Sequence, residues 1–227
     1  MGIITVEKSD HLYWLGRYTE RVFTTLRTFC EYYDRMIDGE VSYTMFCEKL
    51  CIPDVYGSKK AFYEKYLYDE NDPFSVYKSL IRAYDNAVVM RSELGSETLA
   101  YIQMALNLFI ESKTSEIPLI KTQDVIDCVL AFWGSVDEQV SDPDMRHLLK
   151  AGKYIERLDL FIRMEYSPTE IAKVLYLLTN ILERSPGIYN RDMLKQLHEI
   201  LETMDEKQGV MWHAVSTVGQ IYEVGAQ

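Results

Sequence analysis

Residues 11–21 read HLYWLGRYTER, and residues 147–157 read HLLKAGKYIER. When the two segments are aligned, the histidine, the first leucine, the glycine, the tyrosine and the final Glu-Arg pair coincide, and Arg17 aligns with Lys153. Both segments lie where the hydrophobic residues repeat with helical spacing. The chain therefore contains an internal duplication of a helix with a Glu-Arg motif.

The first copy lies on a long hydrophobic stripe whose members are spaced three and four residues apart, as on one face of an α-helix. The stripe consists of Leu12, Leu15, Thr19, Val22, Leu26, Phe29, Tyr33 and Met36. We predict one helix over about residues 9–38, with Ser9 as its N-cap and Gly39 near its C-terminal end. The second copy predicts a helix over about residues 143–165, which Asp142 and Pro143 would begin.

The rest of the chain predicts further helices separated by short loops. Their expected spans are 41–50, 59–68, 72–94 (begun by Asp72-Pro73), 96–112 (capped by Ser96), 122–140 (after a loop with Pro118), 167–184 (with a capping box at Ser167 and Glu170 and a break at 185–187), 190–205 and 210–222. No segment alternates with period two as a strand does. We predict an all-α fold, a compact helical bundle that forms a single domain over residues 1–227.

The composition limits the class of protein. The chain has 227 residues, is 48% hydrophobic, and has a net charge of -11. This hydrophobic content is enough for a real core. The negative charge disfavours nucleic acid as a partner. No apolar run reaches the roughly 18 residues of a membrane span, and the N-terminus does not resemble a signal peptide, so we expect a cytoplasmic protein with no membrane partner.

Four cysteines are present, and none is part of a CxxC pair. In a reducing cytoplasm we expect free thiols. Cys47 and Cys51 are four residues apart, but two thiols with no further Cys or His nearby make a poor zinc site. We predict that they are buried as small hydrophobic side chains.

Gly16 and Gly152 occupy matching positions inside the two motif helices. Glycine in a helix interior costs roughly 1 kcal/mol relative to alanine. Its presence at both positions indicates that something approaches the helix backbone closely. A crossing helix is one candidate and a ligand is the other, and we favour close helix packing.

The Glu-Arg pairs require partners outside their own motif, because adjacent helical residues point about 100° apart. The simplest solution is reciprocal, with Glu20 bonded to Arg157 and Glu156 bonded to Arg21. The planar guanidinium can donate two parallel hydrogen bonds to a carboxylate. In this interpretation the motif defines the arrangement of two helices.

The alternative interpretation is a cationic pocket that binds a carboxylate or a phosphate. The candidate residues for the pocket or for the bridge between repeats are Arg17, Tyr18, Glu20, Arg21, Lys153, Tyr154, Glu156 and Arg157. His11 and His147 are weaker candidates, as a shared metal site or a proton-transfer pair, although a histidine near a helix start is more often a surface or capping residue.

Other site chemistries find no support in the sequence. A di-iron bundle needs Glu-x-x-His on two helices, and no glutamate lies three residues before any of the four histidines. Gly-rich phosphate loops and nucleophile elbows are missing as well. We therefore expect no cofactor, no metal and no ATP site in this chain.

At these residues the sequence resembles the bacterial alpha-E domain family, all-helical proteins named for a recurring Glu-Arg motif. Residues 12–21 are similar to the N-terminal signature of the family, and residues 152–157 are similar to its second copy. A further family block is represented in part by residues 84–87, Tyr-Asp-Asn-Ala, and by Arg91, which adds Asn86 and Arg91 as weaker site candidates.

The resemblance implies a partnership with ATP-grasp amide-forming enzymes. We therefore expect a helical accessory protein that works with such a ligase in the synthesis or modification of a peptide or small amide, and that binds the substrate, the product or the ligase itself. One alternative is an enzyme of the same pathway, in which the arginines hold an anion and Glu20 or Glu156 acts as general base. Another is a structural dimerisation module, and a homo-oligomer is left open.

Overall fold

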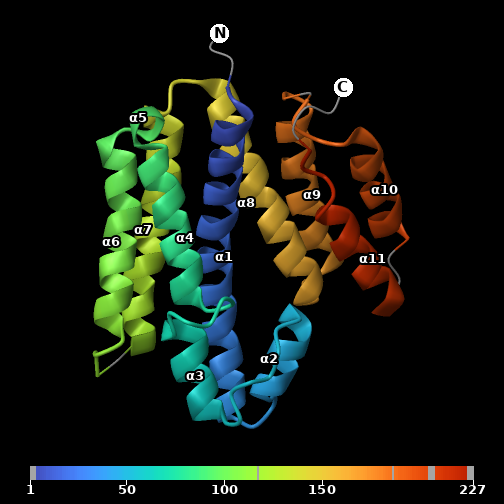
Figure 1. The fold of residues 1–227 in the computed structure, drawn as a ribbon. Coiled ribbons are helices and arrows are strands. Elements are labelled where there is room, and N and C mark those ends of the chain that lie inside the picture. Colours follow the sequence, from blue (N-terminus) through green and yellow to red (C-terminus); the bar gives the residue numbers. More distant parts are fainter. Residues whose placement is uncertain (1–3, 117, 186, 204–207, 224–227) are drawn as a thin grey trace. The chain divides into compact units, whose positions relative to one another are not determined.

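The computed structural model describes residues 4–116, 118–185, 187–203 and 208–223 (Figure 1). Over these residues the regular structure is α-helical, and the only β-type pairing is an isolated antiparallel bridge between Tyr189 and Tyr222. The all-α prediction is confirmed. No helix in this part of the chain is both long enough and apolar enough to cross a membrane.

The chain divides into two units, Met1–Arg17 with Asp142–Gln227, and Tyr18–Ser141. The division falls inside the first helix, α1 (Val6–Ile37), which contributes to both units. We call the first unit the motif unit, because it contains both motif glycines, and the second the central unit. The single domain over residues 1–227 stays a prediction.

The motif unit contains the start of α1 and four helices of its own. These are α8 (Pro143–Arg163), α9 (Pro168–Leu182), α10 (Arg191–Glu202) and α11 (Gln208–Val218). Helix α8 packs against α9 and α11, and α10 packs against α9 and α11. Its core is aliphatic, with fully buried side chains such as Ile155, Leu158, Leu178 and Leu197.

The central unit contains the rest of α1 and the helices between residues 43 and 139. These are α2 (Tyr43–Leu50), α3 (Lys59–Tyr68), α4 (Val76–Val89), α5 (Arg91–Leu94), α6 (Ser96–Ser112) and α7 (Pro118–Gln139). Helix α6 packs against both α4 and α7, and α3 packs against α4. The largest fully buried side chains here are aromatic, among them Phe29, Phe46, Phe62 and Phe109.

Several helix ends follow the predicted signals. The Asp142 side chain accepts hydrogen bonds from the first turn of α8, with Pro143 at the first helical position. Ser167 and Glu170 form the predicted capping box at the start of α9. Gly39 has φ +78°, the left-handed conformation expected of a glycine just past a helix end. The predicted stripe on α1 is buried except for Tyr33, which is half-buried.

The predicted N-cap of α1 is wrong. The helix begins at Val6, and Ser9 lies inside it, almost fully buried. Thr5 takes the capping position, because its hydroxyl accepts a hydrogen bond from the Lys8 amide at 3.3 Å. Ser9 and Thr5 both carry a hydroxyl group, and Thr5 is the one that lies at the helix start.

The predicted helix over residues 72–94 is also wrong at its start and in its middle. Asp72 and Pro73 form a turn, in which the Asp72 carboxylate accepts from the Phe74 amide at 2.9 Å. Ser75 is the N-cap of α4, since its hydroxyl accepts from the Lys78 amide. At Met90 the backbone leaves helical geometry, which separates α4 from the short α5.

Smaller corrections concern three other boundaries. Pro118 begins α7 instead of lying in a loop before it, a position that suits its missing N–H. Gly95, with φ +80°, is the N-cap of α6, so Ser96 is its first helical residue. Helix α11 ends at Val218, because Ile221 accepts a backbone hydrogen bond from Asn190 and Tyr222 pairs with Tyr189. The predicted break at Pro186 and the predicted helix end at Asp205 lie outside the described residues.

All four cysteines are free thiols, as predicted. Cys47 and Cys128 are buried, and Cys30 is half-buried. The predicted burial of Cys51 is wrong: it is exposed, because it lies at the left-handed C-cap of α2 with φ 55°.

Candidate functional site

The two motif glycines lie at a close crossing of α1 and α8. A methyl group added at Gly16 would collide with the carbonyl oxygen of Leu149 and would lie 3.1 Å from the backbone nitrogen of Lys153. A methyl group added at Gly152 would collide with the carbonyl oxygen of Tyr13 and would lie 3.1 Å from the backbone nitrogen of Arg17. Each helix therefore approaches the backbone of the other at its glycine.

The crossing has pseudo-two-fold symmetry. Tyr13 and Arg17 lie three residues before and one residue after Gly16, and Leu149 and Lys153 have the same offsets from Gly152. Each glycine contacts the equivalent positions of the other copy. The prediction that the glycines permit close helix packing is confirmed, and the duplicated sequence corresponds to a duplicated contact.

A buried ion pair lies beside this crossing. The Arg17 Nε and Nη2 atoms both lie 2.7 Å from Oε2 of Glu156. The Glu156 side chain is fully buried, and that of Arg17 is 14% exposed. Burial alone would lower the pKa of Arg17, but the charges of Glu156, Tyr13 and Asp159 and the hydrogen bond to Glu156 together outweigh this effect and raise the pKa. Removing either partner would leave the other buried and uncompensated.

The predicted reciprocal pairs, Glu20 with Arg157 and Glu156 with Arg21, connect residues of different units and stay a prediction. Glu20 is fully buried, and within its own unit it accepts a hydrogen bond from the Thr24 hydroxyl at 2.7 Å. In both copies of the motif the glutamate is buried and the following arginine is half-buried. The two copies therefore have the same burial pattern.

A second ion pair lies one turn further along α8. Arg163 donates two hydrogen bonds to Asp159, at 2.8 and 3.2 Å. Burial raises the pKa of Asp159, the hydrogen bond from Arg163 opposes that rise, and the nearby Glu156 charge adds to it. This pair was not predicted from the sequence. Its signal is present, because Glu156, Asp159 and Arg163 have helical spacing within an otherwise apolar face.

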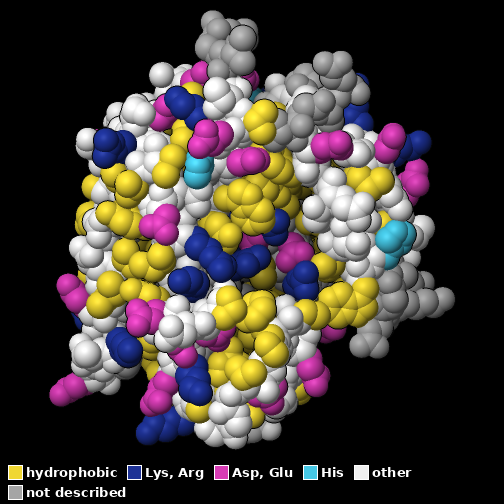
Figure 2. All heavy atoms as spheres, in the orientation of Figure 1, with side chains coloured by type: hydrophobic (Ala, Val, Ile, Leu, Met, Phe, Trp, Pro, Cys, Tyr) yellow, Lys and Arg dark blue, Asp and Glu magenta, His cyan; other side chains and the backbone are white. Residues whose placement is uncertain are grey.

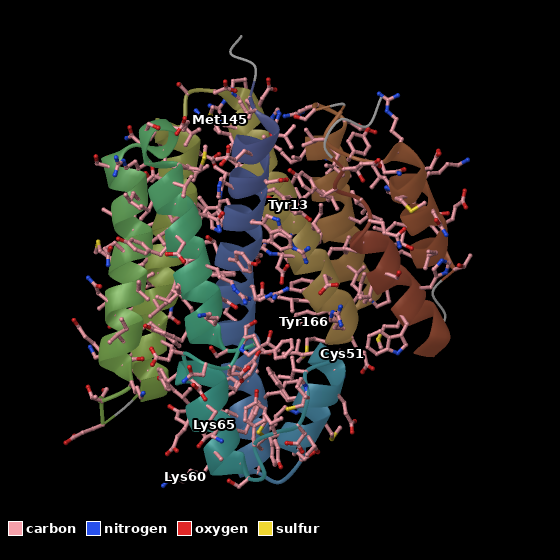
Figure 3. All side chains as sticks on the ribbon, in the orientation of Figure 1. Tyr13, Cys51, Lys60, Lys65, Met145 and Tyr166 are labelled. Carbon is pink, nitrogen blue, oxygen red and sulfur yellow. The ribbon has the colours of Figure 1, made fainter. Side chains whose placement is uncertain are left out.

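Two aromatic rings lie near the guanidinium of Arg17. Its Cζ lies 5.2 Å from the ring centroid of Trp14 and 5.8 Å from that of Tyr13. The Tyr13 ring stacks on Tyr222 with centroids 3.6 Å apart, and the Tyr222 hydroxyl donates to Asp10 at 3.0 Å. Burial is the main cause that raises the pKa of Tyr13. Figure 3 shows Tyr13 on α1.

The remaining predicted residues fall into separate environments. Tyr154 has two cations near its ring, the Nζ of Lys153 at 5.8 Å and the Cζ of Arg157 at 5.9 Å. In the central unit, Tyr18 has the Arg82 guanidinium 5.6 Å from its centroid.

The weaker candidates are placed as follows. Asn86, on α4, donates to the carbonyl oxygen of Arg82, and Arg91 is exposed on α5. His147 Nδ1 lies 2.9 Å from the Ser185 hydroxyl, and burial is the main cause that lowers the pKa of His147. His11 is half-buried on α1. Across the described ranges, no group of three or more His, Cys, Asp or Glu residues could hold a metal ion.

The site thus consists of two helices in backbone contact, with buried carboxylates and flanking aromatic rings. These features define a class of all-helical proteins with a duplicated Glu-Arg helix. A family model for the Alpha-E domain, described as a predicted alpha-helical domain with a conserved ER motif, matches residues 8–208. The chain therefore belongs to the Alpha-E family. A search of curated proteins returns no match, and a search of solved structures returns none.

Proposed function

We propose that this protein is a cytoplasmic bacterial accessory protein that works with an ATP-grasp amide ligase. In this proposal it takes part in the synthesis or modification of a peptide or small amide, and it binds the substrate, the product or the ligase. Membership of the Alpha-E family supports the setting, because the family resemblance of the motif implies this partnership.

The observation that favours an accessory role over catalysis is the engagement of Glu156. Its carboxylate is fully buried and bonded to Arg17 beside the helix crossing. A general base must reach the proton that it removes, and it must be able to accept that proton. A buried carboxylate held by a guanidinium meets neither requirement, whereas it fits a residue that fixes the geometry of two helices.

The net charge of -11 is consistent with binding partners that are not polyanionic. Both acidic and basic side chains appear on the visible face (Figure 2). Exposed aromatic side chains in the motif unit, Trp14, Tyr176 and Trp212, offer apolar contact area for a peptide or a protein partner.

The experiment is a reconstitution with the ATP-grasp ligase encoded nearest to this protein. The purified ligase is assayed for phosphate release and for amide product by mass spectrometry, with and without the accessory protein. We expect a complex on gel filtration, or a higher product yield when both proteins are present. This protein alone should not convert the ligase product.

Two results would oppose the proposal. If there is neither a complex nor a change in yield, the partnership is wrong. If this protein converts the product in the absence of the ligase, the enzyme alternative replaces it. The Glu156→Gln variant separates the two roles: an architectural residue should lower the melting temperature, whereas a catalytic base should abolish conversion at an unchanged melting temperature.

A further inference from the structure

The central unit contains a solvent-open cavity of about 780 Å³ that includes none of the motif residues. It is lined by α3, by the loop after α3, by α4, and by the C-terminal end of α6. Its volume lies within the range of roughly 300–1,000 Å³ that is usual for small-molecule sites. The cavity is therefore large enough for a ligand of a few residues.

One wall of the cavity is aromatic and apolar. Tyr63, Tyr68 and Tyr77 line it together with Ile110, whose side chain is 47% exposed. The Tyr68 hydroxyl lies 3.1 Å from the Ser112 hydroxyl, and the rings of Tyr63 and Tyr68 meet edge to face at 6.4 Å. Fixed aromatic rings offer contact area to an apolar side chain at low conformational cost.

The charged side chains of the lining have both signs. Lys65, on α3, and Lys113, at the end of α6, are cationic (Figure 3 labels Lys65). Glu64, Asp69 and Glu70 are anionic. A nucleotide or another polyanion would meet these three carboxylates, so its binding is disfavoured. A ligand with one amino group and one carboxylate can pair with both the anionic and the cationic side chains of the lining.

The loop that supplies the acidic wall is held in place by hydrogen bonds. The Asp69 carboxylate accepts from the Asn71 amide at 2.9 Å, and the Asp69 carbonyl accepts from the Ser75 hydroxyl at 2.7 Å. The Tyr56 hydroxyl donates to Asp72 at 2.8 Å. An ordered wall loses little conformational freedom when a ligand binds.

We propose that this cavity binds a short zwitterionic peptide. Its carboxylate contacts Lys65 and Lys113, its amino group contacts Asp69 and Glu70, and an apolar or aromatic side chain packs on the three tyrosines. The assignment of this peptide as the substrate or product of the ligase rests on the proposed function. The binding itself does not.

The test is equilibrium dialysis of the full chain against two peptide mixtures, read by mass spectrometry. One mixture contains tripeptides with free ends and a central Tyr, Phe or Leu, and the other contains the same sequences with acetylated and amidated ends. We expect peptides with free ends to be retained about tenfold better than blocked ones, the ratio that corresponds to about 1.4 kcal/mol.

Three variants define the site. Lys65→Ala/Lys113→Ala should abolish the preference for a free carboxylate, and Asp69→Asn should weaken the preference for a free amine. Asparagine retains an oxygen for the Asn71 amide, so the loop should stay folded. Lys121→Ala is the matched control, because Lys121 is a half-exposed lysine of the same unit that does not line the cavity.

Equal retention of both mixtures, or equal retention by the wild type and the cavity variants, overturns the assignment. Selective retention combined with no effect of this protein on the ligase would leave the cavity intact and contradict the ligase partnership. A complex with the ligase but no selective retention would contradict the cavity assignment alone.

Discussion

The two parts of α1 pack by opposite means. In the motif unit, α1 meets α8 at glycines, so that two backbones touch and no side chain separates them. In the central unit, the continuation of α1 places Phe29 against the rings of Phe46, Phe62 and Tyr66, with centroids 5.8–6.0 Å apart. One contact depends on the absence of side-chain atoms, and the other depends on their bulk.

This difference shows at which of the two contacts amino-acid substitutions are least tolerated. A backbone contact cannot yield to an added methyl group, because no flexible side chain is available to move. An aromatic cluster can repack around a substitution of similar volume. Glu156, in the second copy of the Glu-Arg motif, lies beside this intolerant contact, so glycine and charge occur together there.

The largest expected effect is that of Arg17→Met. The variant keeps an apolar side chain of similar length but leaves Glu156 buried and uncompensated. We expect a loss of about 3–5 kcal/mol in the free energy of unfolding. Urea denaturation followed by circular dichroism measures it. A loss below about 1 kcal/mol would indicate that Glu156 does not depend on this partner.

Next are Gly16→Ala and Gly152→Ala. Each added methyl group collides with a backbone carbonyl, which we expect to cost about 1–3 kcal/mol in spite of the better helix propensity of alanine. Gly134→Ala, inside α7, is the matched control, since nothing lies within 4 Å of an added methyl group. That variant should be more stable by roughly 1 kcal/mol. If all three variants changed the free energy of unfolding in the same direction, the backbone contact at Gly16 and Gly152 would be contradicted.

A smaller effect is expected for Phe29→Leu in the aromatic cluster. Phe29 is fully buried, but a hydrophobic replacement of comparable volume usually costs less than about 1.5 kcal/mol. Thermal unfolding of this variant should resemble that of the wild type more closely than that of Gly152→Ala. If Phe29→Leu proves the more damaging of the two, the contrast between the two contacts is wrong.

The smallest effect concerns His147. Burial lowers the pKa of His147 below that of the unfolded chain, so its contribution to stability is present above the unfolded pKa and is lost as the pH falls through the folded pKa. Urea midpoints measured between pH 8 and pH 5 should fall less for His147→Gln than for the wild type. If the urea midpoints of both proteins fall equally with pH, a stability contribution from the half-buried His147 bonded to Ser185 is contradicted.

The sequence predicted much of the fold where a signal had a single interpretation. Helix α3 and the capping residues Asp142 and Ser167 lie where expected. Asp142 and Ser167 are each followed by a proline, which is favourable at the first position of a helix. Two of the boundary errors arose where more than one residue could cap the helix: Ser9 or Thr5 at α1, and Asp72 or Ser75 at α4. Hydrogen bonds within one turn decide between them, and propensity alone does not rank them.

The site was predicted in part. The glycines and the duplication indicated the crossing of α1 and α8, but not that Arg17 would bond Glu156. The rotation of each helix about its axis determines which side chains of α1 lie near Glu156, and the sequence alone does not fix that rotation. Tyr222 could not be predicted as a neighbour of Tyr13, because it lies 209 positions further along the chain and no motif marks it.

The most direct test of the central claim, that the Glu-Arg motif defines the contact of two helices, is a double-mutant cycle of Arg17→Met and Glu156→Leu. The free energies of unfolding of the wild type, both single variants and the double variant give the coupling between the two side chains. We predict a coupling of more than about 3 kcal/mol, with the double variant close to the wild type in stability. Additive losses, with a coupling below about 0.5 kcal/mol, would contradict the claim.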